Sequence, residues 1–150
     1  MPKKEEITNV SEIRRMFNLL RHPAEFRPRD VMQVLIGSAI LAVPVAFTEE
    51  TWKLGEFLPM ANVVALLVIS LLMVSFFVFY NYYRRNFKEQ WDQFIKRVIG
   101  TYLVAALVVA VLLTLIQKAP WTLDWVLALK RTIIITFPAS MSGAVADMIK

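Results

Sequence analysis

Cysteine is absent from this 150-residue sequence, and histidine occurs once, as His22. Without thiols, the chain can form neither a disulfide framework nor a thiolate metal site. One histidine in a charged N-terminal segment also excludes a histidine-cluster metal site and a Ser-His-Asp triad within the apolar part of the chain. The sequence shows no nucleophile paired with a base, no metal-ligand pair and no phosphate-binding loop. We therefore expect a protein that is not an enzyme and has no cofactor.

Charged residues are also scarce over long stretches of the chain. Apolar residues make up 57% of the sequence and charged residues 19%, and the mean hydropathy is +0.53. The apolar residues form long uninterrupted blocks, which predicts an integral membrane protein with the lipid bilayer as its main partner. The net charge of +5 does not indicate a nucleic-acid partner, because the basic residues flank the apolar blocks instead of forming one continuous surface.

Four uncharged runs lie between charged residues and predict the membrane-spanning segments. They contain 18, 27, 20 and 15 residues, at positions 31–48, 57–83, 98–117 and 132–146. A bilayer core about 30 Å thick needs about 20 helical residues, so the first three runs are long enough and the fourth is short. The fourth becomes adequate if Lys130 and Arg131 reach the interface or face the interior of the bundle. We predict an all-α polytopic membrane protein with four transmembrane helices; three spans with a re-entrant or tilted fourth helix are the alternative.

The residues before the first span are polar and basic. We therefore divide the chain into a cytoplasmic segment, 1–30, and a four-helix transmembrane domain, 31–150. Within the first segment, apolar residues recur at helical spacing and predict a short amphipathic helix: Ile13, Met16, Phe17 and Leu20. A similar pattern around Trp91 and Phe94 predicts an interfacial helix or an extension of the third span.

The distribution of lysine and arginine predicts the orientation. Seven of these residues precede the first span and five lie between the second and third. The other two connections contain only Lys53 and Lys118, apart from Lys130 and Arg131 at the start of the fourth span. By the positive-inside rule, we expect a multi-pass protein of the cell membrane with both termini in the cytoplasm. Glu49 and Glu50, together with Lys130 and Arg131, would then lie at the outer side.

The first span ends abruptly on Glu49 and Glu50. Carboxylates at this depth are expensive unless they are paired, hydrated or coordinating a cation. The helix before them has one polar, irregular face, whose four residues fall within about 60° at 3.6 residues per turn: Gln33, Gly37, Pro44 and Thr48. In the fourth span, Pro138 is expected to kink the helix and Gly143 to permit close contact. Tight packing explains such residues, but helices interrupted by glycine or proline also line substrate sites.

Two segments carry a resemblance to a known family. Residues 44–55 follow the arrangement Pro-x-x-aromatic-Thr-x-Glu-x-Trp-x-x-Gly, and Phe137-Pro138-Ala139-Ser140 is followed by Gly143. Both resemble an archaeal and bacterial family of integral membrane proteins of unknown function, and the likeness covers most of the four-helix region. Carried over residue by residue, it singles out seven positions: Pro44, Thr48, Glu50, Trp52, Gly55, Pro138 and Gly143. The resemblance implies a membrane location and supplies no substrate, cofactor or mechanism.

Two classes of function fit this pattern. In the first, the protein is an oligomeric cation channel or transporter, with Glu50 and Glu49 as an outer site for inorganic cations and Thr48 and Gln33 along the path. Rings of carboxylates select cations, and a pore would need several subunits because four helices enclose little space. We therefore expect a homo-oligomer, held together by helices containing small residues.

In the second class, the protein is a membrane scaffold or interaction protein that transports nothing. Here Glu49 and Glu50 form structural ion pairs with Lys130 and Arg131, which hold the first helix to the fourth. Burial makes such pairs costly to break without giving them a further function. The sequence gives transport a slight preference, because the polar groups coincide with residues that interrupt helices.

Overall fold

The described part of the computed structural model, residues 26–83 and 90–149, consists of helices without strands. Its elements are α2 (Pro28–Ala46), α3 (Glu49–Phe57), α4 (Met60–Val78) with the π-helical turn η1 (Phe79–Tyr83), α5 (Trp91–Leu115) and α6 (Trp125–Met148). The predicted all-α class is therefore confirmed. The amphipathic helix expected around Ile13 lies outside the described residues.

Three helical segments are long and apolar enough to cross a membrane: Pro28–Ala46, Met60–Tyr83 and Trp91–Leu115. They correspond to the first three predicted spans. The 24-residue helix α6 is not among them, since Lys130, Arg131 and Asp147 interrupt its apolar sequence. The structure thus supports a membrane protein with three candidate spans.

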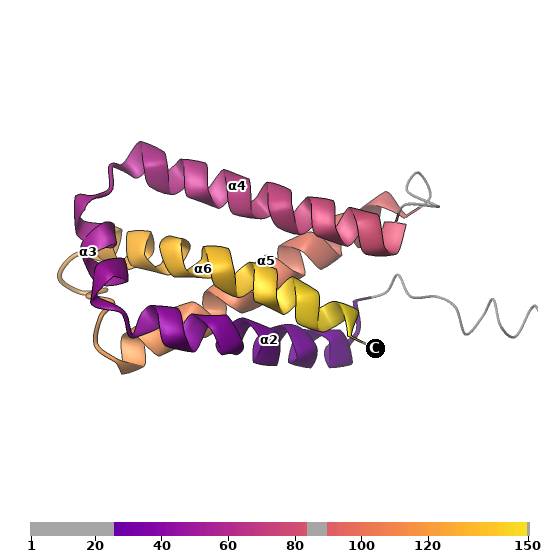
Figure 1. Ribbon diagram of the computed structural model, residues 1–150, viewed down its shortest axis with the longest axis horizontal. Coiled ribbons are helices and arrows are strands. Elements are labelled where there is room, and N and C mark those ends of the chain that lie inside the picture. The colour runs from indigo at the N-terminus through magenta and orange to yellow at the C-terminus, as the bar shows by residue number, and fades with distance from the viewer. Residues whose placement is uncertain (1–25, 84–89, 150) are drawn as a thin grey trace, which may run out of the picture.

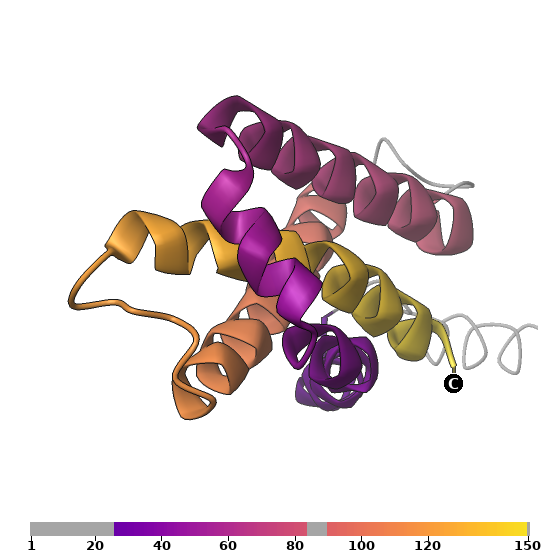
Figure 2. The same cartoon turned by 60° about the vertical axis from the view of Figure 1, so that its left-hand side comes forward.

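Helix α6 occupies the centre of the bundle. Figure 1 shows it between α2 and α4 with α5 behind, and Figure 2 shows the same neighbours after a turn of the molecule. Eleven of its 24 residues are buried, compared with four of 19 in α4. Because its neighbours surround α6, its polar side chains can find partners within the protein instead of lipid. The charges that shorten its apolar run therefore lie inside the fold.

Different elements lie at the two ends of the bundle. At one end, here called the Arg97 end, α2 begins, η1 lies, α5 begins and α6 ends (Figure 1). At the opposite end, here called the α3 end, α3 crosses the bundle and residues 116–124 connect α5 to α6. The start of α2 and the end of α6 therefore lie at the same end of the molecule.

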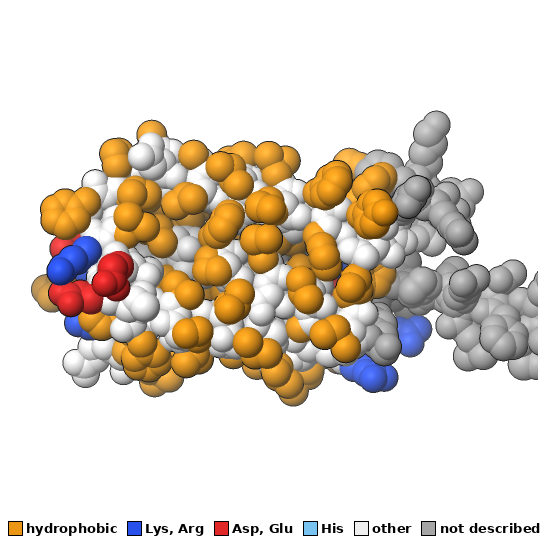
Figure 3. Space-filling view, in the orientation of Figure 1, with side chains coloured by type: hydrophobic (Ala, Val, Ile, Leu, Met, Phe, Trp, Pro, Cys, Tyr) orange, Lys and Arg blue, Asp and Glu red, His pale blue; other side chains and the backbone are white. Residues whose placement is uncertain are grey.

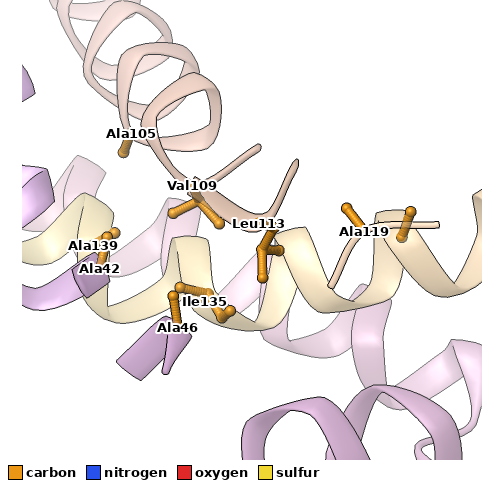
Figure 4. Close-up of a cluster of buried hydrophobic side chains, with 9 residues drawn as sticks. Ala42, Ala46, Ala105, Val109, Leu113, Ala119, Ile135 and Ala139 are labelled. Atoms are coloured by element: carbon orange, nitrogen blue, oxygen red, sulfur yellow. The ribbon is translucent and has the colours of Figure 1, made fainter. Parts of the chain in front are cut away.

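Small residues allow the helices to pack closely. One core cluster combines alanines of α2 and α6 with Val109 and Leu113 of α5 (Figure 4). A Cβ added at Gly37 would clash with the Cβ of Ala146, and one added at Gly143 would clash with the hydroxyl oxygen of Ser38. The hydroxyl of Ser142 also donates a hydrogen bond of 2.7 Å to the carbonyl of Gly37. The glycines of α2 and α6 thus serve close helix contact.

Pro44, on the irregular face of the first span, and Pro138, the expected kink of the fourth, both lie inside helices. Pro44 is exposed near the end of α2, and α6 continues through Pro138. Along the polar, irregular face of the first span, Gly37 is buried whereas Pro44 and Thr48 are exposed. Thr48 follows α2 and precedes the first residue of α3. The helix is therefore interrupted at Phe47 and Thr48, which connect α2 to α3.

Candidate functional site

Arg131 of α6 is the centre of a polar cluster at the α3 end. Its side chain is 9% exposed, and its Nη2 lies 2.6 Å from Oε1 of Glu56. Its Nη1 donates to the carbonyl oxygen of Lys118 at 2.7 Å, and its Nε donates to that of Trp52 at 3.2 Å. One guanidinium therefore joins α6 to α3 and to the loop after α5. Such multiple hydrogen bonds suit the planar fork of an arginine.

Glu56, rather than Glu49 or Glu50, is the carboxylate that pairs with Arg131. Glu49 pairs with Lys53 at 2.9 Å, four residues along α3, and Glu50 is exposed without an ion pair in the described ranges. The expected pairing of Glu49 and Glu50 with Arg131 was therefore wrong. Its physical reason is that both residues occupy the first turn of α3, where the helix dipole favours a carboxylate and solvent is accessible.

Lys130 also has a partner other than the predicted glutamates. Its ammonium group donates a hydrogen bond of 2.9 Å to the carbonyl oxygen of Leu58, which follows the last residue of α3. The carbonyl groups in the last turn of a helix lack partners within that helix. Lys130 therefore caps the end of α3 instead of forming an ion pair with Glu49 or Glu50.

Three residues of the 44–55 segment have clear structural roles. The indole nitrogen of Trp52 donates to the carbonyl of Ala46 at 2.8 Å, and the hydroxyl of Thr48 donates to that of Val45 at 2.7 Å. Both bonds satisfy carbonyl groups at the end of α2. A Cβ at Gly55 would lie 2.6 Å from Cγ of Arg131, so glycine lets the arginine stem pass against α3.

A polar cleft of about 380 Å³ lies over this cluster. Its walls include Trp52, Glu56, Lys118 and Arg131. The ammonium of Lys118 lies 4.1 Å from the centre of the Trp52 ring, within the range of a cation–π contact. On the face shown in Figure 3, acidic and basic side chains gather at the α3 end, and the surface of the middle of the bundle is largely hydrophobic. The cleft is therefore at a boundary between polar and apolar surroundings.

A second charged cluster, at the Arg97 end, was not predicted from the sequence. Arg97 of α5 is fully buried, and Asp147 of α6 receives hydrogen bonds from its Nε at 2.8 Å and its Nη2 at 2.9 Å. Asp30 of α2 lies 3.4 Å from the same Nη2. The Tyr82 ring lies 3.9 Å from the guanidinium carbon, and the Tyr82 hydroxyl donates to the carbonyl of Asp147 at 2.9 Å. Arg97 thus connects α2, α5 and α6 with η1.

Gln33 of α2 lies near this second cluster rather than near Glu49 and Glu50. Its amide nitrogen donates to the carbonyl of Ile149 at 2.9 Å, just beyond the end of α6. The residues proposed for a single cation path are therefore divided between the two ends of the bundle. Between the ends, the hydroxyls of Ser38 and Thr101 are buried without a hydrogen-bond partner in the described part of the chain.

These features together define a class of protein. Apolar helices long enough to cross a bilayer surround buried arginines that are paired with carboxylates, as is typical of helical integral membrane proteins. The family described as "Putative integral membrane protein (DUF2391)" matches residues 5–149. The chain belongs to this family of unknown function, which confirms the resemblance seen in the sequence. Comparisons with curated proteins and with solved structures gave no match.

Proposed function

We propose that this protein is a membrane scaffold whose four helices all span the bilayer and whose buried arginines hold the central helix in place. The observation that carries the proposal is that each of the three side-chain nitrogens of Arg131 bonds to a group of the same chain: one carboxylate and two carbonyls. An arginine bound in this way maintains a fixed arrangement of α3, α6 and the 116–124 loop. Glu56 is 49% exposed, but the guanidinium of Arg131 is buried, so loss of the carboxylate leaves a buried charge without its partner.

The fourth span is α6. Its 24 residues extend over about 36 Å at 1.5 Å per residue, which exceeds a hydrocarbon core of about 30 Å. Arg131 and Asp147 lie near opposite ends of the helix, and both contact charged partners within the protein. Charged side chains in spans are tolerated when they face the interior of a bundle in this way.

Both termini are proposed to lie in the cytoplasm. The start of α2 and the end of α6 share the Arg97 end, where Arg27, Arg29 and Lys96 are exposed. The absence of native cysteine permits a direct test. In intact cells, an impermeant thiol reagent should label Lys53→Cys and leave Arg27→Cys unlabelled until the cells are opened; labelling of Arg27→Cys alone would reverse the topology.

The scaffold is proposed to be a homo-oligomer. Ala106 and Ala110 form a small-xxx-small pair on α5 and are only half-buried within one chain. Ala110 also borders a shallow apolar depression of about 290 Å³ next to Trp121. A pair of small residues that the chain's own packing does not use can let a helix of a second copy approach closely.

A cation channel is the second candidate. Glu49 and Glu50 are adjacent, exposed and at the start of α3, and Glu50 has no ion pair in residues 26–83 and 90–149. In a ring of subunits, such glutamates would form the fixed negative charge that attracts cations. This arrangement would need several copies around one axis.

One pair of matched substitutions on α3 separates the two candidates. For a scaffold, Glu56→Gln should lower the thermal stability of the purified protein, because a buried guanidinium loses its carboxylate, whereas Glu50→Gln should leave the stability unchanged. Liposomes containing the wild-type protein should show no cation flux above empty liposomes. A wild-type flux that Glu50→Gln abolishes without loss of stability would overturn the scaffold proposal and favour the channel.

A further inference from the structure

An apolar groove lies between α4 and α6. It has a volume of about 690 Å³, which is within the usual range of about 300–1,000 Å³ for small-molecule sites. Its walls come from Met73, Phe76 and Phe77 of α4 and from Met141 and Val145 of α6. Phe76 is 73% exposed, so the groove opens to the surroundings of the bundle. Unbranched methionines can adapt to a flexible apolar ligand.

The groove ends at polar residues at the Arg97 end of the bundle. Tyr80 and Asn81 border it, and both belong to the π-helical turn η1 at the Arg97 end. Single π-helical turns are frequent at functional sites. Tyrosine is typical of the level of lipid headgroups, where its ring remains in apolar surroundings and its hydroxyl meets water. A ligand in the groove would therefore have its polar part at the Arg97 end.

The Arg97 end carries an excess of exposed positive charge. Among residues 26–83 and 90–149, Arg27, Arg29 and Lys96 are exposed there, against one exposed carboxylate, Asp92. Asp30 and Asp147 are buried around Arg97, so this cluster has one net negative charge, which reduces the positive excess without cancelling it. A positive surface beside a membrane attracts anionic lipid headgroups.

We propose that the groove binds an acyl chain of an anionic glycerophospholipid from the leaflet at the Arg97 end. The apolar walls accept the chain, and the basic end attracts the headgroup. A second copy of the protein is the less favourable occupant, because the half-buried pair of small residues that lets a second copy approach closely lies on α5, which contributes no wall to this groove. This inference goes beyond the scaffold proposal and does not depend on it.

A single-cysteine variant tests the groove in the full chain. Val145→Cys places a thiol in the groove at a position that is 45% exposed, and Ile40→Cys places one on the apolar surface of α2, at a position that is 64% exposed. Each variant is labelled with a small fluorophore and reconstituted into phosphatidylcholine vesicles. Brominated phosphatidylglycerol or brominated phosphatidylcholine, at equal mole fraction, is then the quencher.

At position 145, brominated phosphatidylglycerol should quench more than brominated phosphatidylcholine. The relative affinity derived from the quenching should favour phosphatidylglycerol about fivefold for each basic side chain that attracts the headgroup. Quenching at position 40 should be nearly equal for the two lipids. Equal quenching by both lipids at position 145 would overturn the proposal, because the groove would then contact bulk lipid only. Oxidation of unlabelled Val145→Cys to a disulfide-linked dimer, with position 145 protected from both lipids, would overturn it in favour of a second copy.

Discussion

Arg97 and Arg131 are buried charges that depend on their partners. Each guanidinium has a carboxylate within hydrogen-bond distance and further polar or aromatic contacts around it. Taking an arginine out of water costs several kcal/mol, which close and well-directed partners offset. The free energy of unfolding should therefore depend strongly on these few carboxylates.

At Asp147, the geometry predicts a larger effect than at Asp30. Asp147 accepts two hydrogen bonds from Arg97, at 2.8 and 2.9 Å, whereas Asp30 lies 3.4 Å from it. Asp147→Asn should lower the free energy of unfolding by about 3–5 kcal/mol, the usual cost of removing one partner of a buried ion pair. Asp30→Asn should cost less. Unfolding of both variants in mild detergent, followed by circular dichroism, would measure the difference.

Asp92→Asn is the matched control for both substitutions. Asp92 is exposed in the first turn of α5, so this change should alter stability only slightly. Equal losses at positions 30, 92 and 147 would show that Arg97 does not depend on Asp147 in particular.

Sequence reasoning found some of these residues and missed others. It placed Arg131 in an ion pair, and its partner proved to be Glu56 because α3 begins at Glu49 and directs the first two glutamates towards solvent. It treated Arg97 only as the end of a span. Arg97 is 67 residues from Asp30 and 50 from Asp147, and pairings over such separations depend on how the helices pack.

At the scale of the helix, α2 and α6 depend on close contact at glycines, where there is no room for an added side chain. A Cβ at Gly37 would clash with that of Ala146, and a backbone oxygen of α6 would lie 3.0 Å away. Neither atom can rotate aside, so a methyl group at position 37 would push the helices apart. Overpacking of this kind typically costs about 1–3 kcal/mol.

Exchanging the two residues gives a direct test of this contact. Gly37→Ala alone should destabilise the protein by about 1–3 kcal/mol, and Gly37→Ala with Ala146→Gly should recover much of the loss because the exchange conserves the total volume. Gly100→Ala is a control with a milder expected effect, because the added Cβ would meet the ring of Phe26, which can turn away. Thermal unfolding of the wild type, Gly37→Ala, Ala146→Gly and the double variant would measure the coupling. Failure of the exchange to recover stability would contradict it.

The helices themselves were largely predictable from the sequence. Runs of uncharged residues identified three apolar helices because the bilayer requires about 20 such residues in succession. The fourth helix was harder to define, since a helix surrounded by protein can contain charges that a lipid-facing helix cannot. The spacing that placed four residues on one face of the first span did not indicate their burial, which depends on the neighbouring helix: α6 buries Gly37, whereas Pro44 is exposed.

At the scale of the whole molecule, the surface has the apolar character expected of a membrane protein. Large apolar side chains on α2, α4 and α5 are exposed, and charged side chains gather towards the ends on the face shown in Figure 3. In water such a surface would drive association, whereas in lipid it does not. Association between copies in lipid must therefore come from specific close packing of helices.

The half-buried pair Ala106 and Ala110 is the expected site of that packing. Ala106→Leu with Ala110→Leu should weaken self-association by about tenfold in dissociation constant, equivalent to ~1.4 kcal/mol, because larger side chains separate the helix backbones. The matched control is Ala61→Leu with Ala65→Leu, a pair with the same spacing that is exposed on α4. Energy transfer between labelled copies, diluted stepwise in vesicles, would measure both constants. A loss confined to the α4 pair would move the interface to α4, and a wild-type protein that stays monomeric at every dilution would exclude a homo-oligomer and, with it, the channel.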